Sequence, residues 1–577
     1  SFCTLLVNNQ QLSPEKMAQV VTKATTAFDD QKPGTSGLRK KVKHFQQANY
    51  VENFVQATFD ALTSAPELGG IPEVLALGGD GRYLSEPVCQ TIIRMAAANG
   101  VKKVVVGQHT LMSTPAVSAV IRTHPSKPGG AFILTASHNP GGPENDFGMK
   151  YNCGNGGPAP EKVTELIYAK SKAITAYKTV EGVSDFDLSV LATHPVTADC
   201  AVEVIDSVSL YADMIASIFD VAAIKALIAR EDFSLLFDGM HGVAGPYAKR
   251  VLVDMLGAPA DMVCNAEPLP DFGGGHPDPN LTYAADLVEA MGLNADGKPW
   301  AGAKLLAGKA ASKAAAPPTF GAACDGDADR NMILGASCYV SPSDSVAIIA
   351  ANADAIPYFR AAGGVKALAR SMPTSGALDL VAKQMGVPIF EVPTGWKFFG
   401  NLMDSAAIYG KTDYTPLICG EESFGTGSSH VREKDGLWAV LAWLNILAVR
   451  NKDSAVGSLV TVEQIQKEHW LRFGRNYYSR YDYEEVSADG AAQLMEAMRA
   501  ITDPASLPAI TMPNGASVPV KSVDDFSYED PVDGSVSKKQ GIRVLFADGS
   551  RFVLRLSGTG SVGATIRLYL EQYVDAA

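Results

Sequence analysis

Short apolar runs alternate with amphipathic segments along most of the chain. Residues 74–77, 101–106 and 131–134 are apolar runs rich in β-forming side chains, and residues 87–98 between the first two have helical spacing. Similar alternation resumes after Ser234 and again after Ser343. This pattern predicts α/β layers built on largely parallel sheets.

The C-terminal part of the chain has a different pattern. Residues 542–546 and 550–554 are apolar runs around Asp548-Gly549, a dipeptide typical of a tight hairpin, and predict an α+β terminal domain. Residues 294–318 are rich in Ala, Gly, Lys and Pro and predict a surface insertion without chemistry, while Ser13 and Pro14 predict the start of an early helix. We place domain boundaries near residues 210, 342 and 466.

Composition narrows the possible partners. The chain has 577 residues, which requires several hydrophobic cores, and its formal net charge of −13 disfavours nonspecific binding to nucleic acid or to an anionic membrane. An anionic substrate would therefore need a locally basic site. Eight cysteines without a C-x-x-C pair, and the lack of an apolar run of roughly 18 residues, predict a cytoplasmic protein with reduced thiols and no membrane span.

A first candidate site follows the apolar run 131–134. Residues 135–142 read Thr-Ala-Ser-His-Asn-Pro-Gly-Gly, which places the Ser137 hydroxyl at the carboxyl edge of the predicted sheet, where open α/β sheets bind ligands. Ser137 can serve there as a nucleophile, and His138 can move a proton or hold a phosphate oxygen. The alternative is a capped turn in which Ser137 bonds only to backbone.

A second candidate site is the sequence Asp-Gly-Asp-Ala-Asp-Arg at residues 325–330, directly after the small apolar run 320–324. Three carboxylates at alternate positions can converge on one hard cation, and Mg2+ is the natural ion. An EF-hand requires Gly at the sixth position and Glu at the twelfth, where this chain has Arg330 and Ala336. The alternative to a metal site is a solvated turn.

Two further segments have polar chemistry. Residues 419–427 contain Glu421 and Ser423 on a glycine-rich loop followed by His430 and residues 432–436, which suits the hydroxyls of a polyol. Residues 555–561 with Arg567 combine guanidinium groups, hydroxyls and glycines, which suits a phosphate dianion. A polar loop and a glycine-rich turn without function are the respective alternatives.

These four segments, in this order, resemble the phosphoserine, metal, sugar and phosphate loops of the α-D-phosphohexomutase superfamily. Residues 32–39, 373–376, 393–397 and 420–436 are similar to those of its eukaryotic-type phosphoglucomutases. The resemblance implies an α/β protein with four domains around a central cleft: three related α/β domains with mixed sheets and a C-terminal α+β domain. They would occupy residues 1–210 with the phosphoserine loop, 211–342 with the metal loop, 343–466 with the sugar loop and 467–577 with the phosphate loop.

The resemblance also implies a reaction. It is the interconversion of glucose 1-phosphate and glucose 6-phosphate through phosphorylated Ser137, with Mg2+ as cofactor and glucose 1,6-bisphosphate as intermediate. The implied metal ligands are Ser137, Asp325, Asp327 and Asp329. Hexose phosphates are the expected partners of a monomer or weak homodimer.

The implied site residues fall into two groups. The catalytic group is Ser137, His138, Lys150 and Arg39, and Lys150 is the favoured general acid or base because burial can move the pKa of a lysine into the working range. The substrate-binding group is Thr35, Arg330, Thr394, Gly395, Glu421, Ser423, Lys434, Arg555, Ser557, Thr559 and Arg567.

Two positions depart from the family pattern, and two other functions stay open. Ala328 stands where these relatives commonly have Gly, so a left-handed backbone there would be strained, and Ser429 replaces an acidic residue. One alternative is a phosphomannomutase or dual-specificity hexomutase. The other is a phosphoglucomutase-like phosphoprotein with a binding or regulatory role in secretion.

Overall fold

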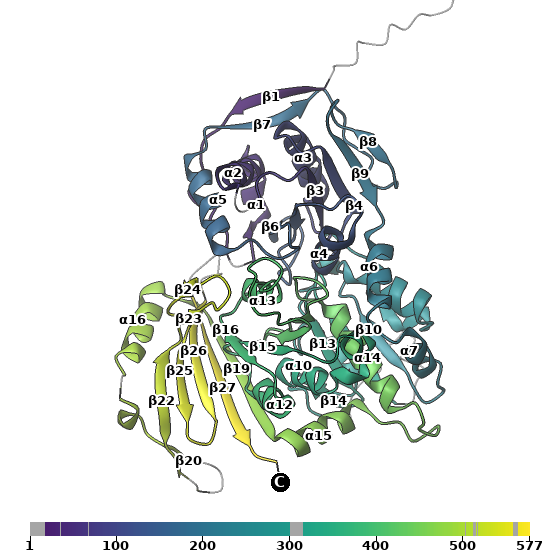
Figure 1. Cartoon of the computed structure of the whole chain (residues 1–577), viewed down its shortest axis with the longest axis vertical. Helices are drawn as coiled ribbons and strands as arrows, with labels where there is room; N and C mark the ends of the chain where they lie inside the picture. The colour runs from purple at the N-terminus through teal and green to yellow at the C-terminus, as the bar shows by residue number, and fades with distance from the viewer. Residues whose placement is uncertain are drawn as a thin grey trace, which may run out of the picture.

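The protein is described here by a computed structural model that covers residues 18–34, 36–66, 69–300, 316–501, 503–511, 515, 517–557 and 564–576. Figure 1 shows the N-terminal sheet and its helices at the top, the second and third sheets below them, and the C-terminal sheet at the lower left. All statements of structure below concern these residues.

The first domain is built on a seven-stranded mixed sheet with the order β2-β6-β5-β3-β4-β9-β8. Its strands are β2 (Leu38–Lys41), β3 (Val74–Gly79), β4 (Lys103–Leu111), β5 (Gly130–Leu134), β6 (Asp146–Cys153), β8 (Thr193–Pro195) and β9 (Ala201–Ile205). Its helices are α1 (Val42–Phe45), α2 (Tyr50–Ser64), α3 (Ser85–Ala98), α4 (Thr114–Thr123) and α5 (Glu161–Ala173). A separate ribbon pairs β1 (Gln19–Ala24) with β7 (Ala176–Glu181).

The second and third sheets are smaller and also mixed. The second has the order β11-β10-β12-β13-β14, with strands Val263–Cys264, Leu235–Asp238, Phe320–Cys324, Asn331–Gly335 and Cys338–Val340. The third has the order β16-β15-β17-β18, with strands Ile389–Val392, Ala367–Ser371, Leu417–Gly420 and Thr426–Ser428. Their helices are α6 (Ser207–Ala216), α7 (Val221–Ile228), α8 (Ala244–Ala248), α9 (Ala285–Ala290), α10 (Pro342–Ala351), α11 (Pro357–Ala361), α12 (Ala377–Met385), α13 (Trp396–Met403), α14 (Gly436–Arg450) and α15 (Val462–Phe473).

The same local arrangement recurs in these three sheets. In each, a buried strand that pairs in parallel with one neighbour is followed by a loop and then by its own antiparallel partner: β5 by β6, β12 by β13, and β17 by β18. The three intervening loops are the segments that contain Ser137, the aspartates and Glu421. Three of the four candidate sites thus occupy equivalent positions in three related domains.

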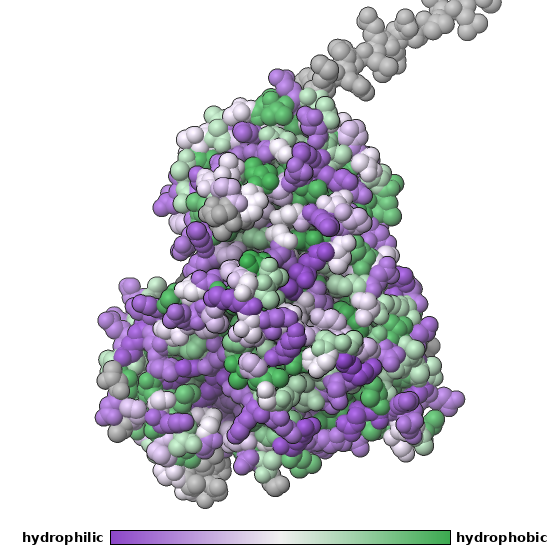
Figure 2. All heavy atoms as spheres, in the orientation of Figure 1, coloured by the Kyte–Doolittle hydropathy of each residue, from purple (hydrophilic) through white to green (hydrophobic). Residues whose placement is uncertain are grey.

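The C-terminal domain has a five-stranded antiparallel sheet with the order β19-β27-β26-β25-β22. Its strands are β19 (Arg475–Val486), β22 (Val520–Asp525), β25 (Ile542–Phe546), β26 (Arg551–Ser557) and β27 (Ala564–Val574), and α16 (Ala488–Arg499) packs on one face through Ala491 and Met495. Figure 2 shows hydrophilic side chains gathered over the part of the molecule that this sheet occupies. One face of the sheet therefore forms a core, and polar side chains occupy much of the domain's surface.

One large apolar core joins the first three domains. Buried side chains of α4, α6, α8, α10, α12 and α14 belong to a single cluster, to which α14 contributes the completely buried Trp438 and Trp443. Because this helix is buried nearly all round, it is a core element. No single helix in the described residues is long and apolar enough to span a membrane, and the pair α6–α7, which meets that test together, is bent by 97°.

The sequence predicted several of these elements. Residues 320–324 and 542–546 are strands with the predicted bounds, the hairpin at Asp548-Gly549 is present, and the predicted helix 87–98 begins two residues earlier, at Ser85. The sheets of the first three domains are mixed, because each ends in an antiparallel hairpin that alternation of strands and helices does not reveal. The predicted helix after Ser13 and residues 301–315 of the predicted insertion lie outside the described residues.

Asp344 should make stability depend on pH. It is buried near the start of α10, where the Trp470 indole donates a hydrogen bond of 3.4 Å to it, and burial raises its pKa from 3.8 to about 6. The folded state therefore holds a proton that the unfolded state releases, so this stability is present below pH 4 and is lost as the pH rises through 6. We expect Asp344→Asn to raise the free energy of unfolding at pH 8 by up to about 3 kcal/mol.

This prediction can be checked by chemical denaturation at pH 4 and pH 8. The exposed Asp354 provides the matched control, since Asp354→Asn should leave the pH profile of stability unchanged. If the free energy of unfolding of Asp344→Asn depends on pH as that of the wild-type protein does, another group sets this pH dependence.

Candidate active site

The Ser137 turn follows β5 and is held in an unusual backbone conformation. Ser137 has a φ of 54° and is almost completely buried. Its amide donates to Thr135 Oγ1 over 2.7 Å, and its hydroxyl donates to Asp325 Oδ2 over 2.9 Å. His138 Nδ1 lies 3.4 Å from the same hydroxyl. A left-handed conformation in a non-glycine residue is unfavourable and marks a constrained site.

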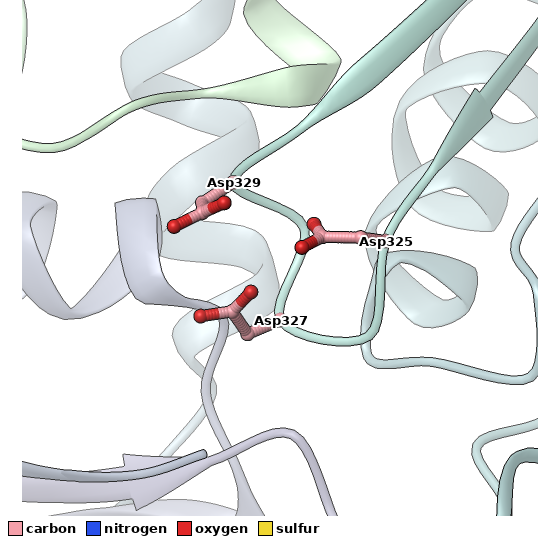
Figure 3. Close-up of side chains that lie close together, drawn as sticks. All are labelled: Asp325, Asp327 and Asp329. Atoms are coloured by element: carbon pink, nitrogen blue, oxygen red, sulfur yellow. The ribbon is translucent and has the colours of Figure 1, made fainter. Parts of the chain in front are cut away.

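The metal loop lies between β12 and β13. Asp325, Asp327 and Asp329 each offer a carboxylate oxygen, and these atoms lie within 4.8 Å of one another. Figure 3 shows the three carboxylates close together around the turn between β12 and β13. Between the second and third aspartates, Ala328 has a φ of 64°, so the strain predicted for an alanine at this position is present.

These residues fit a divalent cation. Asp327 Oδ1 and Asp329 Oδ1 are buried and have no hydrogen-bond partner among the described residues. Burial, together with the charges of Asp327 and Asp329, raises the pKa of Asp325 well above its ordinary value. Three crowded carboxylates with unpaired oxygens are costly without a counter-ion, and carboxylate oxygens are ligands suited to hard cations.

The sugar loop, between β17 and β18, is joined to the metal loop by backbone contacts. Arg330 forms an isolated β-bridge with Gly425, and the Asn331 amide donates to the Phe424 carbonyl over 2.9 Å. Glu421 is buried and accepts a hydrogen bond of 3.0 Å from the amide of Gly395. Ser423 is half-buried on the same loop.

Residues 432–435 tie the three domains together beside the sugar loop. Glu433 accepts hydrogen bonds of 2.8 Å from both Lys150 and Asn152 on β6. Lys434 lies 3.2 Å from Asp329 in the metal loop, and the Tyr211 hydroxyl donates to Asp435 over 2.7 Å. This segment therefore brings charged groups from three domains into one buried cluster.

Arg39 and His138, two residues of the predicted catalytic group, lie beside this buried cluster of charged groups. Arg39, on β2 opposite Gly148 of β6, is half-buried, and its buried Nε atom has no hydrogen-bond partner among the described residues. Burial, aided by the charges of Arg330 and Arg39, lowers the pKa of His138 well below 6.5. The His138 imidazole is therefore neutral near pH 7, so it can accept a proton or a hydrogen bond.

The phosphate segment lies on the C-terminal sheet. Arg555 and Arg567 are cross-strand partners on β26 and β27, and the neighbouring Tyr569 hydroxyl donates to Glu422 over 3.1 Å. Ser557 is the last residue of β26. Thr559 lies outside the described residues, as does Thr35 of the first domain.

The contacts above connect ten of the predicted site residues with one another: Ser137, His138, Lys150, Asp325, Asp327, Asp329, Arg330, Gly395, Glu421 and Lys434. Thr394, next to Gly395, has a buried hydroxyl without a hydrogen-bond partner among the described residues. Arg555 is linked to this cluster through Tyr569 and Glu422, and Arg567 is the cross-strand partner of Arg555.

Sequence reasoning missed the buried pair Asp80 and Arg82. The Arg82 guanidinium pairs with Asp80 at 2.9 Å and donates to the Ser137 carbonyl over 2.8 Å, while Thr135 donates to Asp80 over 2.6 Å. The pair thus holds both sides of the Ser137 turn. The signal that could have found it is Gly78-Gly79-Asp80-Gly81-Arg82, a glycine-rich segment at the end of a predicted strand.

The double variant Asp80→Asn/Arg82→Gln should test this positioning role, because it removes both charges and leaves no lone buried ion. We expect kcat to fall about 10²-fold while KM changes by less than about twofold, since a displaced nucleophile costs rate rather than binding. Asp232→Asn/Arg230→Gln is the matched control, as this pair also spans two residues at 2.9 Å and makes no contact with the Ser137 turn. A wild-type kcat in the Asp80/Arg82 variant would contradict the role.

Fold and site together define a class: multidomain α/β proteins in which a buried serine lies beside a loop with three aspartates. Family models for the phosphoglucomutase/phosphomannomutase α/β/α domains I, II and III match residues 30–178, 209–337 and 342–469. A model for the phosphoglucomutase-1 C-terminal domain matches residues 475–577.

Similar proteins agree with these matches. The cytoplasmic phosphoglucomutase of Bromus inermis is 56% identical over 567 residues, covering 96% of this chain and 92% of that protein. The probable cytoplasmic phosphoglucomutase 2 of Arabidopsis thaliana is 56% identical over 566 residues, covering 95% and 92%. The chain belongs to the phosphoglucomutase/phosphomannomutase family.

A solved structure supports the same fold. The exocytosis-sensitive phosphoprotein pp63/parafusin, a phosphoglucomutase from Paramecium, in its open form, matches with a TM-score of 0.80 and 47% identity, covering 97% of this chain and 92% of that one. The expectation of three related α/β domains with mixed sheets and a separate C-terminal domain is therefore confirmed.

Proposed function

We propose that the chain interconverts glucose 1-phosphate and glucose 6-phosphate through a phosphorylated Ser137. The observation that carries this proposal is the hydrogen bond of 2.9 Å from Ser137 Oγ to Asp325, which places the hydroxyl at the edge of the three-aspartate site. Relatives at 56% identity over nearly the whole chain are phosphoglucomutases, and these support a glucose phosphate as substrate.

Mg2+ is the proposed cofactor, held by Asp325, Asp327, Asp329 and the Ser137 oxygen. When bound, it would neutralise charge on the phosphoryl group that is transferred. Phosphoryl transfer leaves the protein little covalent chemistry beyond placing the reacting oxygens and stabilising charge. Arg330, whose guanidinium lies 3.9 Å from Asp325 and 3.4 Å from Asp278, is proposed to contact the same phosphoryl group.

The proposed cycle uses both ends of the sugar. Phosphorylated Ser137 donates its phosphoryl group to the free hydroxyl of the hexose monophosphate and gives glucose 1,6-bisphosphate. The bisphosphate reorients, and its other phosphate returns to the Ser137 oxygen. Glu421 and Ser423 are proposed to hold sugar hydroxyls in both orientations, with Thr394 and Gly395 beside them and the phosphate segment on the nonreacting phosphate.

Lys150 is the proposed general acid or base. Its ammonium group lies 2.8 Å from Glu433 in a buried ion pair, so it can pass a proton to this carboxylate, and the resulting amine can accept a proton from the sugar hydroxyl. We expect Lys150→Met to slow phosphoryl transfer about 10²- to 10⁴-fold. Rapid-quench kinetics would measure this, with the half-exposed Lys103, paired with Glu203 at 3.1 Å, giving the control Lys103→Met. A decrease below about tenfold would argue against Lys150.

A coupled assay tests the proposed function as a whole. Glucose 6-phosphate should form from glucose 1-phosphate in the presence of Mg2+ and catalytic glucose 1,6-bisphosphate. No product from folded protein would favour a binding role, and faster turnover of mannose 1-phosphate would favour a phosphomannomutase. Neither alternative is favoured by the relatives at 56% identity.

Three further expectations accompany the proposal. The relatives are described as cytoplasmic, in agreement with the location predicted from the sequence. A monomer or weak homodimer remains the proposed state. We propose the four domains with boundaries near 210 and 342, and we move the third from 466 to Gly474, because residue 466 lies inside α15.

A further inference from the structure

The open face of the C-terminal sheet presents a group of three arginines and one aspartate. On β19, Asp482 lies opposite Arg567 of β27, and Arg480 lies opposite Tyr569. Arg567 in turn lies opposite Arg555 of β26. Because directly opposed residues of an antiparallel pair point to the same face, and residues two apart on a strand share it, the three guanidinium groups occupy one face.

Asp482 interacts with two of these arginines. Arg480 donates to it through Nε over 2.7 Å and also through Nη2. Arg567 Nε lies 3.4 Å from Asp482 Oδ2 in an ion pair, but this buried Nε makes no hydrogen bond to any of the described residues. One carboxylate thus pairs with two guanidinium groups, and the Nε atom of one of them has no hydrogen-bond partner among the described residues.

The same face borders the proposed sugar site. Tyr569, which lies between Arg480 and Arg555 across the strands, donates its hydroxyl to Glu422, the residue after Glu421. Tyr478 on the same strand as Arg480 donates to the Pro373 carbonyl of the third domain over 2.8 Å. Arg480 and Asp482 therefore lie where a phosphate attached to the sugar can reach them.

We propose that Arg480 binds the nonreacting phosphate together with Arg567, and that Asp482 is a placeholder which this phosphate displaces. The proposal deepens the function proposed above and rests on it for the hexose phosphate. A phosphate dianion carries more charge than a carboxylate and offers three acceptor oxygens, so it satisfies both guanidinium forks where Asp482 satisfies one. When the phosphate leaves, both arginines pair with Asp482 again. Because no charge is left without a partner, the bisphosphate is released for its reorientation at a lower cost in free energy.

An arginine and an aspartate two residues apart can also be an ordinary surface pair, which contributes little. The chain has a matched pair for comparison in the same domain. Arg499 and Asp525 have side-chain exposures of 31% and 22%, against 30% and 23% for Arg480 and Asp482, and Arg499 contacts Asp525 at 2.6 Å. The control pair is not shared with a third charged residue in the contacts described.

The test measures binding without turnover, in protein that also carries Ser137→Ala. Isothermal titration with glucose 6-phosphate, and separately with inorganic phosphate, at fixed ionic strength gives the affinities. We expect Arg480→Gln to weaken binding about tenfold and Asp482→Asn to strengthen it about threefold or more, because the competing carboxylate is gone. Arg499→Gln should change neither affinity by more than about twofold. In the active protein, Asp482→Asn should lower KM and kcat together, because release becomes slower.

The two variants should change the affinity in opposite directions, and this distinguishes a ligand site from a structural pair. Loss of a structural contact would weaken binding in both variants. The proposal is overturned if Arg480→Gln binds like its parent, or if Asp482→Asn binds more weakly. Should Arg480→Gln prove unstable, Arg480→Lys keeps the charge but loses the fork and should still weaken binding. Glucose 6-phosphate could fail to bind to the parent while inorganic phosphate binds more weakly to Arg480→Gln and more tightly to Asp482→Asn. In that case the substrate assignment fails and the placeholder role of Asp482 stands.

Discussion

Replacing Ser137 with alanine should reduce the interconversion of glucose 1-phosphate and glucose 6-phosphate by at least about 10⁴-fold, because a nucleophile and phosphate carrier is lost without a substitute. The position admits no easy replacement: its left-handed backbone and its hydrogen bond to Asp325 place one hydroxyl at the metal loop. The coupled assay measures the rate, and intact-mass analysis with peptide mapping should find a phosphate on Ser137 in the wild-type protein.

The control for this experiment is Ser171→Ala. Ser171 is also buried, but it lies on α5 and donates only to the Tyr168 carbonyl within the same helix. This variant should keep full activity. Interconversion at the wild-type rate in the Ser137→Ala protein would refute the phosphoserine proposal.

Disabling the metal loop should have the second largest effect. Asp327→Asn replaces a charged ligand with a neutral one but keeps an oxygen that can accept the Thr114 hydrogen bond of 2.7 Å. We expect a loss of about 10³-fold in kcat, since a divalent ion contributes several kcal/mol to the stabilisation of transition-state charge. Chelation should abolish activity in the wild-type protein, and Mg2+ should restore it.

Thermal unfolding gives a second measure that does not depend on turnover. Mg2+ should raise the melting temperature of the wild-type protein in a saturable manner, because a ligand that binds only the folded state stabilises it. Asp327→Asn should weaken that response, while Asp286→Asn, at an exposed position of α9 in the same domain, should preserve it. An unchanged Mg2+ response in Asp327→Asn would argue against this metal site.

The recurrence of one loop position offers a physical account of how the site is assembled. Each of the three loops follows a fully buried strand and precedes its antiparallel partner, so each begins from a rigid strand end. Rigid elements place functional groups more precisely than free loops do. The three related domains can therefore contribute a serine, a set of aspartates and a glutamate to one place.

The sequence alone determined the apolar strands and the local chemistry of each loop. Residues 320–324 and 542–546 could be predicted because their alternation and turn signals depend only on neighbouring residues. The three aspartates could be recognised because residues at alternate positions of one loop must lie near one another, and the resemblance to a known family rested on such contiguous segments.

Only the tertiary structure decided which distant residues meet. Lys150 and Glu433 are 283 positions apart, and Ser137 and Asp325 are 188 apart, yet both pairs are in hydrogen-bond contact. The glycine-rich segment that contains Arg82 signals a site, but it does not tell which turn the guanidinium contacts. Asp482 has no local feature that separates it from ordinary charged residues, so its contact with Arg567 could not be predicted. The physical reason is that burial and the packing of domains bring these charges together, and neither is encoded in the spacing of residues along a single segment.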